Sequence, residues 1–129
     1  MTMHWPKNAP IRIFIWMVVL VAGQLIGRAV DGHAILKESS PPANSSVTGP
    51  DVPITLKFNV RIDAARSKLQ LVHPDNAMRN LVLDKQASPD TLTTKAAGLQ
   101  PGAYKIAWQV LAPDGHITRG LIPFTVTSV

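Results

Sequence analysis

The sequence predicts an all-β domain, a sandwich or small barrel of immunoglobulin-like type, behind an amino-terminal leader. Apolar residues recur at every second position through much of the chain after residue 33, and turn-forming residues interrupt these runs about every ten residues. The chain of 129 residues contains no cysteine, so an apolar core alone must hold the domain together. At about 100 residues, the part after the leader is large enough for one such core.

The leader is the first element of the chain. The stretch Ile13–Ile26 is almost wholly apolar, it follows the basic residues Lys7 and Arg12, and small residues come after it. This order is typical of a secretory signal peptide. Gln24 and Arg28 interrupt the run before the roughly 20 apolar residues that a membrane span needs, so an uncleaved anchor is the weaker alternative.

Two cleavage positions have small residues at the required spacing. Cleavage after Ala29 leaves Val30 first, and cleavage after Gly32 leaves His33 first. The local pattern does not choose between them. The choice decides whether the backbone amine of His33 is free.

We expect residues 1–32 to be the signal peptide and residues 33–129 to be the mature domain. The chain has 13 basic and 8 acidic residues; three of the former and one of the latter precede residue 33, which leaves +3 for the domain. These charges are spread along the chain without a basic cluster or an aromatic stripe, so we expect no nucleic-acid partner. We expect membrane contact only through the leader.

Six runs with a period of two, together with turns about every ten residues, predict a domain of about seven short strands. The runs are 52–58, 68–71, 81–83, 92–95, 104–110 and 122–126. Pro123 predicts an edge position or a bulge in the last of them. Residues 62–69 are expected to form at most one helical turn.

Turn residues separate the runs, and one turn has a specific meaning. The turns are expected at 41–44, 74–76, 88–90, 100–102 and 113–115. Tyr104 follows the Gln100-Pro101-Gly102 turn at the start of a strand. This is the arrangement of a tyrosine corner, in which the hydroxyl bonds back to the preceding backbone.

Hydrolytic catalysis has little support. The chain has no thiol, and its serines lie in a Pro- and Asn-rich stretch without a Gly-x-Ser-x-Gly elbow. We therefore expect that the protein is not an enzyme.

Three histidines remain after the leader: His33, His73 and His116. We expect His73 to be an exposed residue of a turn. Asp114 and His116 flank Gly115, and Asp-Gly between two apolar runs also predicts an ordinary hairpin turn. In extended backbone, however, residues two apart point their side chains the same way, so a carboxylate and an imidazole would converge.

If His33 is the first residue, its α-amine and ring nitrogen can chelate a metal ion together. With the ring of His116 and the carboxylate of Asp114 the set has three nitrogens and one oxygen, which favours Cu(II). The thiolates and methionine clusters that Cu(I) prefers are missing, since Met78 is the only methionine after the leader. The sequence therefore predicts one cupric ion per chain, with His33, Asp114 and His116 as metal ligands.

At these residues the sequence resembles the CopC family of periplasmic copper-resistance proteins. The matching segments are His33-Ala34, Leu36, Ser40–Ala43, Leu56–Phe58, Leu99–Tyr104, Trp108, Asp114–His116, Gly120 and Phe124–Val126. The resemblance implies a Greek-key β-sandwich or barrel, periplasmic location, and a histidine-brace site for Cu(II) made by His33, Asp114 and His116. It also implies a role in copper resistance, homeostasis or transport, with a CopD-like inner-membrane protein that takes up the metal.

The sequence departs from the family pattern at two places. It has no Met-rich loop for Cu(I), and Phe58-Asn59-Val60-Arg61 has no carboxylate where some members carry a glutamate. Two other functions stay open: a copper-dependent oxidase or monooxygenase, because a histidine brace can activate oxygen, and a metal-free immunoglobulin-like interaction module. The second would follow from cleavage after Ala29.

Overall fold

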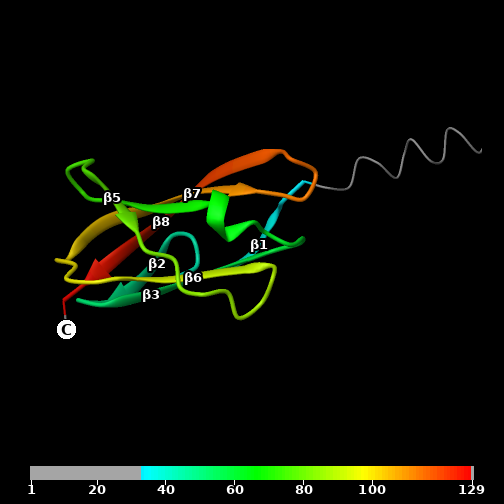
Figure 1. Ribbon diagram of the computed structural model, residues 1–129. Helices are drawn as coiled ribbons and strands as arrows, with labels where there is room; N and C mark the ends of the chain where they lie inside the picture. Colours follow the sequence, from blue (N-terminus) through cyan, green and yellow to red (C-terminus); the bar gives the residue numbers. More distant parts are fainter. Residues whose placement is uncertain (1–32, 129) are drawn as a thin grey trace, which may run out of the picture. The chain divides into compact units, whose positions relative to one another are not determined.

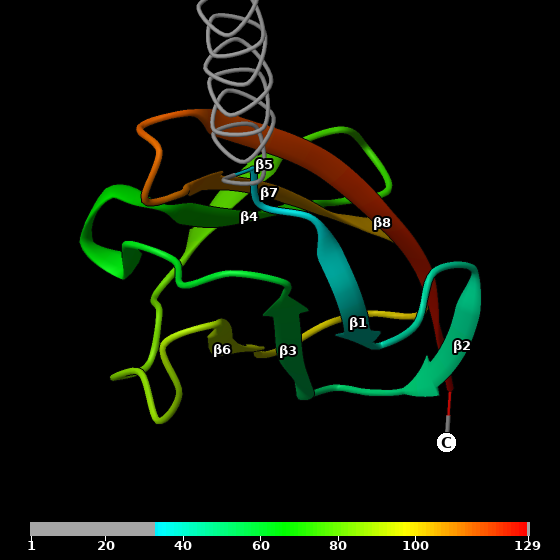
Figure 2. The ribbon, with the colours of Figure 1, turned by 90° about the vertical axis from the view of Figure 1, so that its right-hand side faces the viewer.

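The computed structural model describes residues 33–128, which form two packed β-sheets (Figures 1 and 2). The predicted leader, residues 1–32, lies outside the described residues. The strands are β1 (Leu36–Ser40), β2 (Ser45–Thr48), β3 (Val52–Phe58), β4 (Lys68–Val72), β5 (Met78–Leu81), β6 (Thr91–Ala96), β7 (Gly102–Leu111) and β8 (Ile117–Thr127). One 3-10 turn, η2 (Ala64–Arg66), precedes β4. The all-β sandwich is confirmed, with eight strands in the described part.

The smaller sheet has the order β1-β3-β6 and the larger has the order β2-β8-β7-β4-β5. All pairings are antiparallel except that of β2 with β8. The alternation that predicts each strand also fills the space between the sheets, because every second side chain points inward. The largest fully buried side chains come from both sheets and include Phe58, Ile54, Leu69, Ile106 and Phe124.

The tyrosine corner is present. The hydroxyl of Tyr104 donates a hydrogen bond to the carbonyl of Gln100 at 2.7 Å, and the ring is buried against Phe124. This feature is a hallmark of immunoglobulin-like sandwiches. It ties the start of β7 to the loop before it.

The strand predictions need three corrections. The strands β1 and β2 were not predicted, because both are sheet edges with little burial and no apolar alternation. The third predicted run is shifted: β5 ends at Leu81, so Leu83 lies outside it. Pro123 is not on an edge strand, because β8 lies between β2 and β7. It precedes the β2 pairing, which begins at Phe124, so its missing N–H leaves that ladder intact.

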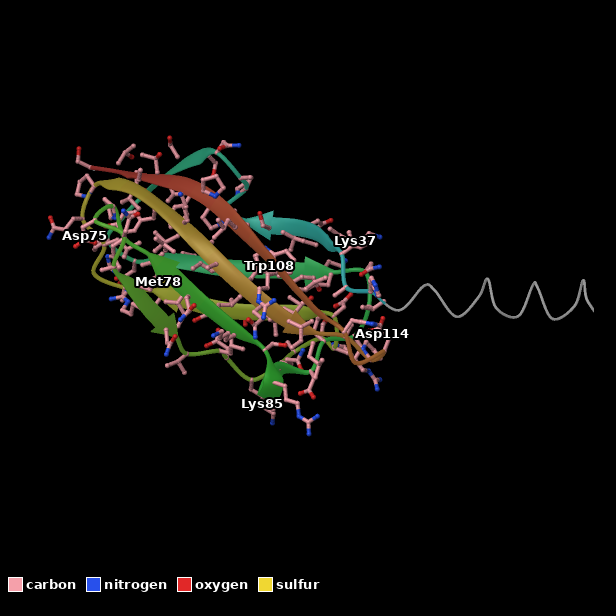
Figure 3. All side chains as sticks on the ribbon, turned by 90° about the horizontal axis from the view of Figure 1, so that it is seen from above. Lys37, Asp75, Met78, Lys85, Trp108 and Asp114 are labelled. Atoms are coloured by element: carbon pink, nitrogen blue, oxygen red, sulfur yellow. The ribbon has the colours of Figure 1, made fainter. Side chains whose placement is uncertain are left out.

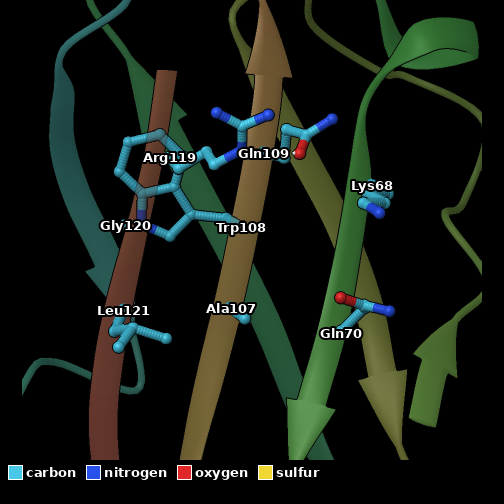
Figure 4. Close-up of a pocket in the computed structure, with 8 residues that line it drawn as sticks. All are labelled: Lys68, Gln70, Ala107, Trp108, Gln109, Arg119, Gly120 and Leu121. Atoms are coloured by element: carbon cyan, nitrogen blue, oxygen red, sulfur yellow. Dashed lines mark hydrogen bonds between the residues drawn. The ribbon is translucent and has the colours of Figure 1, made fainter. Parts of the chain in front are cut away.

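A shallow groove of about 400 Å³ runs along the outer face of the larger sheet (Figure 4). Trp108 and Gly120, paired across β7 and β8, are among the residues that line it. The indole lies against Gly120, where a side chain would collide with the ring. It also makes a T-shaped contact with Phe58 at a centroid distance of 5.3 Å. Trp108 therefore links the two sheets in the half of β7 nearer the β7–β8 turn.

Candidate metal centre

The tight turn between β7 and β8 carries two of the predicted ligands. The N–H of Ala112 donates to the carbonyl of His116 at 3.1 Å, and the N–H of Gly115 donates to the carbonyl of Ala112 at 3.0 Å. Gly115 has φ of +83°, a conformation that favours glycine. The hairpin predicted from Asp114-Gly115 is thus confirmed.

The reasoning that brought Asp114 and His116 together was wrong in one respect. Asp114 lies in the turn and His116 follows it directly before β8, so neither belongs to a strand. They meet because the Asp114 side chain folds back: its Oδ1 accepts the backbone N–H of His116 at 2.9 Å. This Asx-type bond fixes the carboxylate and leaves Oδ2 free for other partners.

Both histidine rings approach that free oxygen. Nδ1 of His33 lies 2.7 Å from Oδ2 of Asp114, and Nδ1 of His116 lies 3.0 Å from it. The two rings lie side by side, with centroids 4.6 Å apart and their planes tilted by 59°. One nitrogen of each ring and one oxygen of the carboxylate lie within 4.8 Å of one another. The structure thus brings all three predicted residues together, across 81 positions of sequence in the case of His33 and Asp114.

The shape of the sandwich explains this meeting. The start of β1 and the β7–β8 turn lie at the same end of the molecule (Figure 1). Figure 3 shows Asp114 at this end, with Asp75 at the opposite one. His33 directly precedes Ala34, which is only 4% exposed, so the histidine lies just before the point where the chain first enters the core.

The carboxylate is ionised throughout the physiological range. The pKa of Asp114 is held well below its usual value, chiefly by the backbone N–H of His116 and then by the ring of His116, with a smaller contribution from His33. A hydrogen bond to the charged form favours that form. Asp114 therefore offers a negative charge to both rings at any pH above strongly acid conditions.

The spacing of these three donor atoms is compatible with binding a cation. Metal–nitrogen bonds of about 2 Å at right angles place neighbouring ligand atoms about 2.8 Å apart. The two N···O separations of 2.7 and 3.0 Å are close to this value. The side chains of His33 and His116 are 56% and 66% exposed, so an ion reaches them from solvent.

The remaining histidine of the described part lies elsewhere. His73 is in the β4–β5 turn as expected, but it is half-buried, with its ring against Tyr104 at a centroid distance of 5.6 Å. The expectation of full exposure was therefore wrong.

Two residues that the sequence analysis did not single out hold the segment after His33. The side-chain oxygen of Asn59 accepts a hydrogen bond from the backbone N–H of Ile35, and the hydroxyl of Thr118 donates one to the carbonyl of Ala34. Nothing in a single sequence marks either residue, since both contacts join segments far apart in the chain.

Comparison with known proteins identifies the family. The family model described as CopC domain matches residues 36–127. The chain belongs to the CopC family. Of the three candidate ligands, Asp114 and His116 lie within the matched residues, whereas His33 lies before them.

Relatives and solved structures agree with this assignment. The chain is 29% identical to Protein YobA of Escherichia coli over 86% of this chain and 92% of that protein. It is also 29% identical to Copper resistance protein C of Xanthomonas campestris pv. juglandis, over 84% of this chain and 91% of that one. The crystal structure of CopC from Methylosinus trichosporium superposes with a TM-score of 0.67 and 30% identity, covering 74% of this chain and 95% of that one.

Within residues 33–128, no helix combines the length and the apolar character required to cross a membrane.

Proposed function

We propose that this CopC-family chain is an exported, periplasmic carrier of Cu(II) that serves copper resistance, homeostasis or transport. One cupric ion binds each chain through the α-amine and ring of His33, the ring of His116 and the carboxylate of Asp114. The observation that carries the proposal is the convergence of two imidazole nitrogens on a single carboxylate oxygen, at 2.7 and 3.0 Å.

The donor set favours Cu(II) over other ions. Imidazole nitrogen, amine nitrogen and carboxylate oxygen suit tetragonal cupric coordination, and Cu(II) leads the divalent first-row ions in affinity for such donors. Cu(I) is disfavoured because it prefers sulfur. Met78, the only methionine after residue 32, lies in β5, away from Asp114 in Figure 3.

The fourth donor depends on where the leader is removed. Cleavage after Gly32 makes the nitrogen of His33 a free amine, which chelates in one ring with Nδ1. The order of the chain supports this position, because His33 is immediately followed by the buried Ala34. Cleavage after Gly32 thus leaves only the ligand residue projecting from the domain.

A carrier needs to accept its ion and to release it. Both histidine side chains are more than half exposed. The ion would therefore remain accessible to a partner without unfolding of the domain. A CopD-like inner-membrane protein is the partner we propose, and a carrier of this kind needs no catalytic step.

Three forms of the protein test the proposal. The first begins at His33, the second begins at Val30, and the third begins at position 33 and carries His33→Ala. In the Val30 form the ring of His33 is retained but its nitrogen is an amide, so only the amine is lost. We expect one cupric ion per chain and a nitrogen-rich electron paramagnetic resonance spectrum for the first form, and affinity weaker by about tenfold or more in the other two. Equal affinity in all three forms would contradict the proposal.

A further inference from the structure

A side chain outside the ligand set fixes the segment that carries His33. Leu36 pairs with Phe58 at the start of the β1–β3 ladder. Ile35 and Asn59 lie just outside this ladder and are joined by two further hydrogen bonds. The backbone N–H of Asn59 donates to the carbonyl of Ile35 at 3.0 Å. The return bond comes from the N–H of Ile35, which donates to the side-chain Oδ1 of Asn59 at 2.6 Å.

This return bond has a physical reason. A hydrogen-bonded antiparallel pair exchanges two backbone bonds, one in each direction. The strand β3 ends at Phe58, and the chain bends at Asn59 and Val60. The Asn59 side chain therefore supplies the acceptor that a continuing strand would have supplied. The hydrogen bonding between the two chain segments therefore extends to Ile35, one residue before β1 begins.

That extra residue matters because of what precedes it. Chain ends fray unless they are tied down. Ala34 is buried, and the hydroxyl of Thr118 on β8 donates to its carbonyl at 3.3 Å. Two hydrogen bonds hold Ile35 to Asn59, and one holds Ala34 to Thr118. His33 is the residue directly before these hydrogen-bonded positions. Its ring reaches Asp114 at 2.7 Å.

We propose that Asn59 is a positioning residue that holds His33 beside Asp114 before any metal arrives. The proposal rests on the proposed copper site for its consequence, and on the metal-free protein for its direct test. Ordering the first residue in advance removes an entropy cost that binding would otherwise bear. Asn59 thus acts on copper affinity through His33 and is not itself a ligand.

Asn59→Ala tests this, with Asn80→Ala as the matched control. Both side chains are exposed, and Oδ1 of each accepts one hydrogen bond; that of Asn80 comes from Gln70 on the larger sheet at 2.8 Å. Asn59→Asp keeps an acceptor oxygen and serves as the conservative variant. The proteins begin at His33. The readouts are amide hydrogen exchange at Ile35 and the ring signals of His33 without metal, then cupric affinity and the paramagnetic resonance spectrum.

We expect Asn59→Ala to speed exchange at Ile35 and to weaken copper binding, each by about threefold to tenfold, the factor that one net hydrogen bond supplies. Core amides such as that of Leu71 should keep their protection, and the cupric spectrum should keep its nitrogen-rich form. Asn59→Asp should restore slow exchange, and Asn80→Ala should change none of these readouts.

Three results would overturn the proposal. The first is unchanged exchange at Ile35 and unchanged His33 ring signals in Asn59→Ala. The second is faster exchange with unaltered copper affinity, which would make the contact structural only. The third is a cupric spectrum with a different donor set, which would make Asn59 a ligand. If the unmodified protein binds no copper, the proposed function fails, whereas exchange at Ile35 and the His33 ring signals still decide whether Asn59 orders His33.

Discussion

Asp114 divides its two carboxylate oxygens between the backbone and the ring of His116. Oδ1 accepts the backbone N–H at 2.9 Å, and Oδ2 lies 3.0 Å from the ring Nδ1. One oxygen therefore holds the turn while the other faces the centre that His33 completes. Because the two tasks are separate, substitutions can remove the charge and keep the turn.

Asp114→Asn should weaken copper binding strongly and leave the fold in place. The amide oxygen can still accept the backbone N–H of His116, but the negative charge beside the cupric ion is lost. We expect affinity to fall by about tenfold to a hundredfold, measured by copper titration against a competing chelator. Asp75→Asn is the matched control, because Asp75 accepts the N–H of Ala77 at 3.0 Å in the β4–β5 turn. Equal losses in both variants would refute the assignment.

Copper affinity should fall as the pH is lowered from 8 to 5. The amine and both imidazoles bind copper only without their protons, so protons compete with the metal as the pH falls. Asp114 takes no part in this slope. Because the pKa of Asp114 is lowered, its carboxylate stays charged at pH values where an ordinary aspartate would take up a proton. It is neutralised only at more acid pH.

The same titration in two variants checks this division of roles. Asp114→Asn should shift the affinity curve downward between pH 5 and 8 without a change in slope, whereas His116→Ala should make it less steep. A slope that flattens in Asp114→Asn would show that the carboxylate titrates in this range after all.

Gly120→Ala should destabilise the domain. A Cβ at this position would lie 2.6 Å from Nε1 of Trp108 and would also collide with Cε2 and Cζ2. The ring also packs against Phe58 at a centroid distance of 5.3 Å, and a shift away from Gly120 would disturb this contact. We expect a loss of about 1–3 kcal/mol in the free energy of unfolding, measured by urea denaturation. Trp108→Leu combined with Gly120→Ala should cost less than the sum of the two single changes, and strict additivity would count against this contact.

Tyr104→Phe should cost about 1–2 kcal/mol of stability, because the carbonyl of Gln100 loses its donor in a part-buried place. Copper affinity should not change, since this corner lies at the other end of β7 from Asp114. Urea denaturation and copper titration on one sample separate the two effects. A loss of copper binding in this variant would indicate coupling along β7.

The sequence predicted the central strands because their side chains alternate between core and solvent. The run 52–58 is strand β3 residue for residue, and 104–110 falls within β7. The edge strands β1 and β2 escaped prediction for the same reason, since neither has a regular buried side. The residues His33, Asp114 and His116 were also picked out from the sequence, by the chemistry of their donors.

The sequence by itself determined the alternation that makes the sandwich, the Asp-Gly turn and the donor types available for a metal. Only the tertiary structure decided that His33 reaches Asp114, and that Asn59 and Thr118 hold the segment behind it. The physical reason is the distance along the sequence over which each interaction acts. Alternation and turn preference depend on neighbours in the chain, whereas a contact across 81 residues depends on how every strand between them is paired and packed.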